Sequence, residues 1–223
     1  MRDAFERELE AITAGLIRMI SQVREMLLMA GKALIEADPA LATRVAELDE
    51  PVDELELALE KECLTLIARH QPVAKDLRFL AAVLKSLTDL ERIGDQSVHV
   101  ADAAARLAQE PPLKRYTDLT RMVQALGTML ERLSAAFVER SAEAARSTLE
   151  MDDEVDDLYR QVQRELLTYM IEDPRTIRKA TELLVVARAL ERIGDHVENV
   201  AERVIYLATG ERVSDSGGGV RTN

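Results

Sequence analysis

The chain has 223 residues, of which 47% are hydrophobic and only 3% aromatic, so its core must consist of aliphatic side chains and methionine. Its formal net charge of −12 argues against nucleic acid as a ligand, because binding a phosphate backbone needs a basic surface. The single cysteine, the charged N-terminal stretch and the lack of a long apolar run predict a cytoplasmic protein that does not insert into the membrane.

The spacing of apolar residues predicts six long helices. Between sparse prolines, these residues recur at intervals of three and four, which is the period of an amphipathic helix. Asp38-Pro39 and Asp173-Pro174 are typical of a capping residue followed by proline at the first helical position. The expected helices span residues 3–36, 39–69, 73–109, 115–139, 142–172 and 175–209. The fold is therefore predicted to be all-α, with a polar, glycine-rich tail at residues 214–223 that is expected to be disordered.

An internal repeat groups these helices into two units. A shift of 103 residues aligns the first half with the second, and the shift has fallen to 100 by Leu90. The stretch LERIGD occurs at residues 90–95 and again at 190–195. We therefore expect two tandem three-helix bundles, at residues 1–110 and 111–213.

Each unit carries two pairs of acids, four residues apart, on the apolar face of a helix. The pairs are Asp49/Asp53 and Glu91/Asp95 in the first unit, and Asp152/Asp156 and Glu191/Asp195 in the second. In each unit the two pairs stand at similar sequence distances from the turn between the second and third helices, so antiparallel packing places them at one height. Four carboxylates that close cannot all stay ionised without a compensating positive charge.

The compensating charge is expected to be a metal ion, with a network of ion pairs to Arg or Lys side chains as the alternative. Clustered oxygen donors without cysteine suit hard cations. Four further residues are candidate edge ligands: His99, Asp102, Asn199 and Glu202.

The neighbours of these acids have expected roles as well. Arg92 and Arg192 should point about 100° away from the acids of the cluster and pair with neighbouring surface acids. His196 should be solvated. Gly94 and Gly194 each cost about 1 kcal/mol relative to alanine inside a helix, which indicates either close helix packing or room for a metal.

The sequence shows no catalytic signature. It has no glycine-rich phosphate loop, no dinucleotide fingerprint and no Ser/His/Asp or Cys/His arrangement, so we expect no enzyme. A di-iron oxidase would need Glu-x-x-His pairs, and none of the three histidines has a glutamate three residues before it. A purely structural scaffold, whose acids are solvated or paired with arginine, is the remaining alternative from the residues alone.

With these motifs the chain resembles the PhoU family. The family pattern of Glu or Asp followed four residues later by Asp is met by all four acid pairs. The stretch QPVAKDLRFL, residues 71–80, also resembles the family sequence at the start of the third helix. His99 departs from the pattern, because many members carry Asn there, as this chain does at Asn199.

The resemblance implies two three-helix bundles, often assembled as homodimers, with iron or another multivalent cation (Mn, Mg, Ca or Zn) at the acid pairs. It implies a negative regulator of the phosphate-starvation response and of phosphate uptake, peripherally associated with membrane partners. Such a protein links the ATPase subunit of the phosphate-specific ABC transporter to the membrane sensor kinase of the phosphate two-component system. An accessory of a low-affinity phosphate permease is the alternative within the same family.

Overall fold

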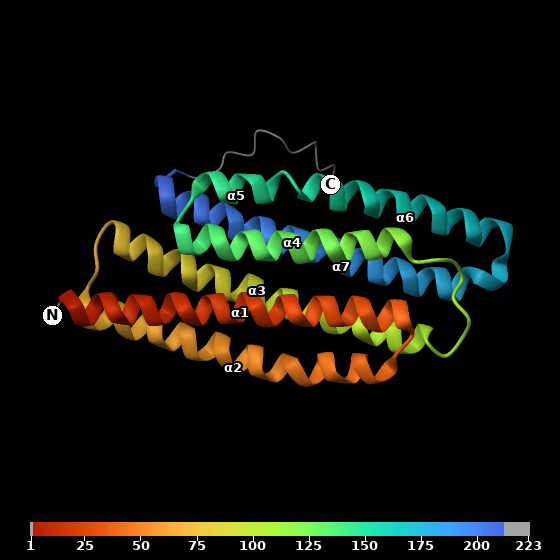
Figure 1. Ribbon diagram of the computed structural model, residues 1–223, viewed down its shortest axis with the longest axis horizontal. Coiled ribbons are helices and arrows are strands. Elements are labelled where there is room, and N and C mark those ends of the chain that lie inside the picture. Colours follow the sequence, from red (N-terminus) through yellow and green to blue (C-terminus); the bar gives the residue numbers. More distant parts are fainter. Residues whose placement is uncertain (1, 212–223) are drawn as a thin grey trace.

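The structure, a computed structural model, describes residues 2–211, and every regular element among them is helical, which confirms the all-α prediction (Figure 1). The predicted tail at residues 214–223 lies outside the described residues. The elements are α1 (Arg2–Glu36), α2 (Pro39–His70), α3 (Lys75–Leu107), α4 (Thr117–Glu139), α5 (Ala142–Leu149), α6 (Asp152–Glu172), a short 3-10 helix (Pro174–Thr176) and α7 (Ile177–Thr209).

The fifth predicted helix, residues 142–172, was wrong, because the structure divides it into α5 and α6. Between them the backbone makes tighter hydrogen bonds, from Met151 to Thr148 and from Glu154 to Met151, which interrupt the α-helical pattern. Neither proline nor glycine marks this point in the sequence. The break makes Asp152 the first residue of α6.

The other boundaries differ by small amounts. The third helix spans residues 75–107 instead of 73–109, and the last begins at Ile177 after the 3-10 turn. Both predicted caps are confirmed. Asp38 accepts a hydrogen bond from the Ala40 backbone N–H at 2.9 Å, and Asp173 accepts one from the Arg175 backbone N–H at 3.0 Å.

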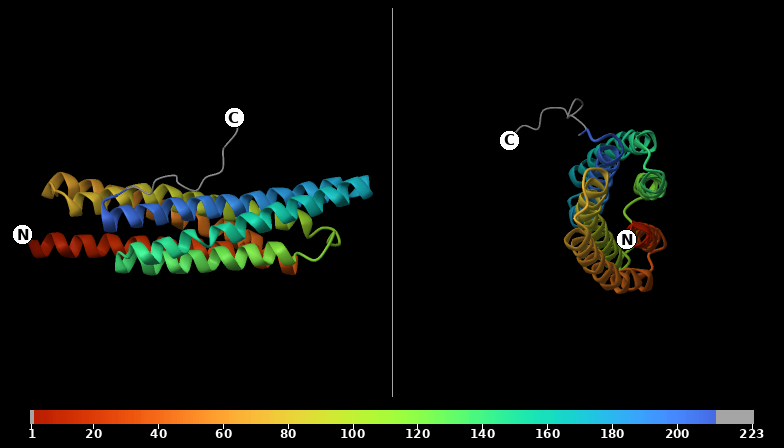
Figure 2. Two further views of the ribbon diagram at one scale, coloured as in Figure 1. Left: turned by 90° about the horizontal axis from the view of Figure 1, so that it is seen from above. Right: turned by 90° about the vertical axis from the view of Figure 1, so that its left-hand side faces the viewer.

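The helices form two layers. α2, α3, α7 and α6 lie side by side, and α1 and α4 pack together on one face of that layer (Figure 2). The contacts between α1 and α4 and between α3 and α7 join the two repeats. Across the first of these seams the Arg24 side chain donates to the Gly127 carbonyl at 2.9 Å and pairs with Glu131 at 2.8 Å.

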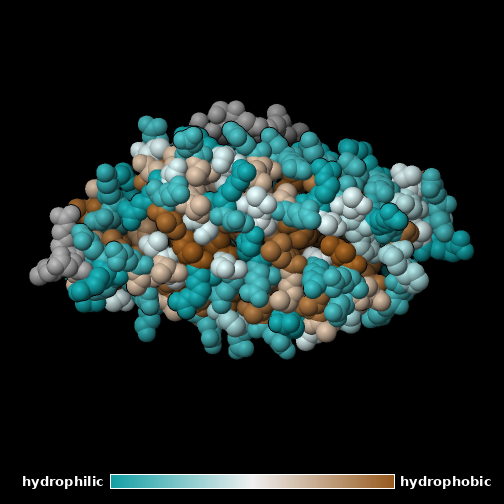
Figure 3. Space-filling model, in the orientation of Figure 1, coloured by the Kyte–Doolittle hydropathy of each residue, from teal (hydrophilic) through white to brown (hydrophobic). Residues whose placement is uncertain are grey.

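Aliphatic and methionine side chains fill the core, as the composition requires. Met19, Met26 and Met129 are fully buried, and the two buried phenylalanines, Phe79 and Phe137, meet edge to face at 6.3 Å. The face that α1 and α4 form is hydrophilic along its edges, with hydrophobic residues gathered along its middle (Figure 3). Among the described residues, none of the helices is apolar over a stretch long enough to cross a bilayer.

Candidate metal centre

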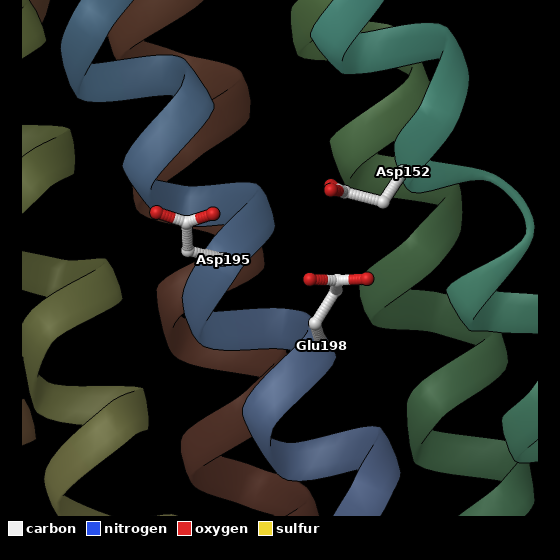
Figure 4. A group of neighbouring side chains, drawn as sticks. All are labelled: Asp152, Asp195 and Glu198. Carbon is white, nitrogen blue, oxygen red and sulfur yellow. The ribbon is translucent and has the colours of Figure 1, made fainter. Parts of the chain in front are cut away.

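The second repeat brings three carboxylates together between α6 and α7 (Figure 4). Asp152 begins α6, and Asp195 and Glu198 stand one turn apart on α7. One oxygen of each of these side chains lies within 4.8 Å of the others. Hard cations take oxygen ligands of this kind, so this group can hold one.

The repeat comparison missed Glu198 because the corresponding residue in the first repeat is Val98. The signal that could have found it is its position three residues after Asp195, which places both on one helix face.

The second cluster consists of Asp152, Asp156, Glu191, Asp195 and Glu198, and its pKa values indicate a shortage of positive charge. Asp152 is only 9% exposed, and its burial together with the charge of Glu198 raises its pKa to about 8. Burial and the neighbouring Asp195 raise the pKa of Glu198 to about 7, and they also raise the pKa of Glu191. Asp152 Oδ1 and Glu191 Oε2 are buried without a hydrogen-bond partner among the residues that the structure describes. Buried carboxylate oxygens normally have a partner, and a multivalent cation would supply one.

The remaining acid of the second cluster, Asp156, is partly compensated. Arg160 pairs with Asp156 at 2.6 Å and also with Asp157 at 2.6 Å. Arg160 therefore compensates the outer side of the cluster, whereas Asp152 forms no ion pair with any of the residues that the structure describes.

The first repeat places its acids between α2 and α3. Burial raises the pKa of Asp49, as do the charges of Asp53 and Asp95, whereas His99 lowers it. Burial also raises the pKa of Glu91, followed by the charge of Asp95. These mutual effects show that the predicted pairs of this unit lie near one another.

Arg92 compensates part of this first cluster. Its Nη1 lies 2.9 Å from Asp95 Oδ2 and its Nε lies 3.3 Å from Glu91 Oε2. The expectation that Arg92 pairs with other surface acids was therefore wrong, because its long side chain folds back onto the two acids of its own helix. In residues 2–211, Arg192 forms no corresponding ion pair, so the two repeats balance their acids differently.

The glycines of the two LERIGD stretches make room for a carboxylate from the neighbouring helix. A Cβ atom on Gly94 would lie 3.3 Å from Asp49 Oδ1. A Cβ atom on Gly194 would overlap Asp152 Oδ1. The glycines are therefore explained by close helix packing, because the atom packed against each of them is a carboxylate oxygen of the neighbouring helix.

The four candidate edge ligands, His99, Asp102, Asn199 and Glu202, all have exposed side chains. The Asn199 amide nitrogen donates to Asp89 Oδ1 at 3.1 Å, on the side of α7 that faces α3.

The same carboxylate accounts for His196, whose predicted solvation was wrong. Its Nδ1 lies 2.9 Å from Asp89 Oδ1, and Arg203 pairs with the other oxygen of Asp89. Asp89 is 7% exposed, and although its burial acts the other way, these hydrogen bonds and the Arg203 charge lower its pKa. Sequence reasoning missed this polar group because it depends on how α3 packs against α7.

Two segments of the chain, residues 16–104 and 119–204, match the family model of the PhoU domain. Over 212 residues the chain is 51% identical to a phosphate-specific transport system accessory protein PhoU homolog from Deinococcus radiodurans, covering 95% of this chain and 100% of the relative. It is 39% identical to the homolog from Pseudomonas aeruginosa, covering 96% of this chain and 88% of the relative.

Solved structures show the same similarity. The crystal structure of PhoU from Pseudomonas aeruginosa matches with a TM-score of 0.90 at 39% identity, over 93% of this chain and 100% of that one. The phosphate transport system regulatory protein PhoU from Streptococcus pneumoniae matches with a TM-score of 0.88 at 30% identity, over 94% and 99%.

Fold, repeat and relatives together define a class of duplicated helical accessory proteins, and not a class of enzymes. Both copies of the matched domain fall on helical repeats that carry an acid cluster. The chain belongs to the PhoU family.

Proposed function

We propose that this protein is a phosphate-transport accessory protein that restrains phosphate uptake and holds the phosphate-starvation response off when external phosphate is plentiful. The observation that carries the proposal is the 51% identity, across the full length of the relative, to a protein named as a phosphate-specific transport system accessory protein. In this role it contacts the ATPase subunit of the phosphate-specific ABC transporter and the membrane sensor kinase of the phosphate two-component system.

The proposed place of action is the cytoplasmic face of the membrane, where the protein works as a peripheral homodimer. Its strongly acidic surface favours partners that offer basic ones, because opposite charges speed encounter and select the orientation of binding. Light scattering of the purified protein tests the dimer, and a monomeric mass at micromolar concentration contradicts it.

The proposed cofactor is a multivalent cation, iron first, with Mn, Mg, Ca or Zn as alternatives. In the second repeat Asp152, Asp195 and Glu198 would hold it, and its positive charge would neutralise the buried carboxylates and tie α6 to α7. This proposal is supported by the buried, unpartnered Asp152 oxygen and by the convergence of the three acids. In the first repeat Asp49, Asp53, Glu91 and Asp95 are the corresponding donors.

Elemental analysis of protein purified without chelators tests the cofactor. The Asp152→Asn and Asp49→Asn variants distinguish metal bound in the second repeat from metal bound in the first. Glu47→Gln, at an exposed position on α2, is the control because it also removes one negative charge. We expect Asp152→Asn to lower the metal content and Glu47→Gln to leave it unchanged. Equal metal content in wild type and Asp152→Asn contradicts the site.

The regulatory role is tested with a phosphate-starvation reporter in cells that lack this gene and grow in high phosphate. We expect the reporter to switch on and the wild-type gene to silence it again. A reporter that stays silent in the deletion strain contradicts the regulator. Changed uptake through a low-affinity permease in that strain would then support the permease accessory instead.

A further inference from the structure

A basic hollow lies between α3, α6 and α7, close to the second acid cluster. It encloses about 570 Å³, and its polar lining comes mainly from Gln96 and His99 of α3, Tyr159 and Gln163 of α6, and Arg188 and Arg192 of α7. No carboxylate stands among the described residues that line it, although the chain has 41 acids. This hollow therefore has the opposite sign to the protein as a whole.

The two arginines of the hollow are available to a ligand. Both side chains are exposed, and neither forms an ion pair with an acid in the part of the chain that the structure describes, although the charges of Glu191 and Asp195 act on Arg188 from the neighbouring acid cluster. Arg188 Nη1 lies 3.5 Å from the Tyr159 hydroxyl oxygen, and Gln163 Nε2 donates to the same oxygen at 2.8 Å. The hydroxyl hydrogen of Tyr159 is thus left to donate elsewhere.

The first repeat shows that the fold does not require an arginine at the position of Arg188, although Arg92 stands at the position of Arg192. By the alignment of the repeats, Tyr159 and Gln163 correspond to Glu56 and Glu60, and Arg188 corresponds to Thr88. There burial raises the pKa of Glu56, and the neighbouring Thr88 side chain acts the other way. The same packing of two helices therefore accommodates Glu56, Glu60 and Thr88 in the first repeat, where the second repeat carries Tyr159, Gln163 and Arg188.

We propose that the hollow binds a phosphate-class oxyanion, with Arg188 and Arg192 as its charged contacts and His99 and Gln96 as further hydrogen-bonding groups. Guanidinium groups match the geometry of phosphate oxygens, and nearby neutral donors complete the hydrogen bonding of such an ion. The choice of phosphate among oxyanions rests on the proposed function, whereas the anion site itself rests on the charges and shape of the hollow.

Equilibrium dialysis of the full chain against inorganic phosphate, after removal of metal by a chelator, tests the proposal. Arg188→Gln and Arg192→Gln are combined in one variant. In the control, Arg121→Gln and Arg178→Gln together remove the same charge from positions that do not line the hollow. We expect saturable binding by the wild type and the control, and at least a tenfold weaker affinity in the double variant. No binding by the metal-free wild type, or equal binding by both double variants, overturns the proposal.

A second variant tests phosphate binding even if the Arg188→Gln/Arg192→Gln double variant folds poorly. Gln163→Glu places in α6 the residue that the first repeat carries at Glu60, so the helix packing tolerates it. We expect it to weaken phosphate binding at least fivefold without changing the helical circular dichroism. Unchanged affinity overturns the proposal. A silent reporter in the deletion strain, by contrast, would remove the proposed function and leave the dialysis result standing.

Discussion

Replacing Asp152 with asparagine should stabilise the metal-free protein at alkaline pH. The folded-state pKa of Asp152 is raised to about 8 from 3.8, so the folded protein keeps a proton that the unfolded chain releases. The free energy of unfolding therefore falls as pH rises from about 4 to about 8, and the destabilisation is complete only above that range. At about 1.4 kcal/mol for each pH unit between the two values, the ceiling on this cost is about 6 kcal/mol.

The expected gain is smaller than this ceiling, because Asp195 is exposed and Glu198 is only half-buried, so that water and salt screen part of their repulsion with Asp152. We expect about 2 kcal/mol, which raises the Tm of a chain of this size by about 4–8 °C at pH 8.5. At pH 4 the wild type and the variant should melt together. Adding Mn²⁺ should raise the Tm of the wild type more than that of the variant, because a ligand that binds only the folded state stabilises it.

Thermal unfolding followed by circular dichroism, with and without chelator, is the assay for Asp152→Asn. Glu47→Gln is the control, since it removes one exposed negative charge from α2. A variant that melts below the wild type at pH 8.5, or one whose Tm has the wild-type pH dependence, would refute the reasoning.

Gly194→Ala should lower the free energy of unfolding by about 1–2 kcal/mol, because the new Cβ overlaps Asp152 Oδ1. Gly94→Ala should leave it nearly unchanged, because the helix preference of alanine offsets the 3.3 Å contact of the new Cβ with Asp49 Oδ1. Urea midpoints compare them, and equal costs would contradict the packing argument. Asp89→Ala should cost about 2–4 kcal/mol at neutral pH, because Arg203 and His196 lose their partner. The pKa of Asp89 is lowered below 3.8 in the folded protein, so the stabilisation by its charge is present above pH 3.8 and disappears as the pH falls through the folded-state pKa. A loss of stability in Asp89→Ala that is the same at pH 7 and pH 2 in thermal melts contradicts this. Cys63 is fully buried with a pKa raised to about 12, so a thiol reagent at pH 8 should label it only after unfolding, and rapid labelling of the native protein would show an open core.

Much of the fold could be predicted because its signals are local. The period of three and four, the Asp-Pro caps and the duplicated LERIGD stretch each depend on residues near one another in the sequence. The break before Asp152 could not be predicted in this way, because it is made by a tighter turn without proline or glycine. It nevertheless decides the site, since it sets the position of Asp152 against Gly194.

The candidate site could be predicted only as far as the repeat is symmetric. The comparison of the halves identified the paired acids but hid Glu198, because Val98 stands at the equivalent position. It also treated Arg92 and Arg192 alike, although in the structure Arg92 folds onto Glu91 and Asp95. Side-chain pairing of this kind depends on rotamers and neighbouring helices, which the spacing of residues along one helix does not determine.

The two repeats therefore differ in how they neutralise similar acids, and this difference has a functional consequence. In the first repeat Arg92 already supplies a fixed positive charge to Glu91 and Asp95. A cation entering that cluster must displace or share this ion pair, which lowers its net gain on binding. In the second repeat Asp152 is buried and Glu198 is half-buried, both have raised pKa values, and both would gain most from a cation. The second cluster should thus fill first. A cation there would change the electric field at Arg192 and Arg188, which stand one and two turns before Asp195 on α7 and line the basic hollow.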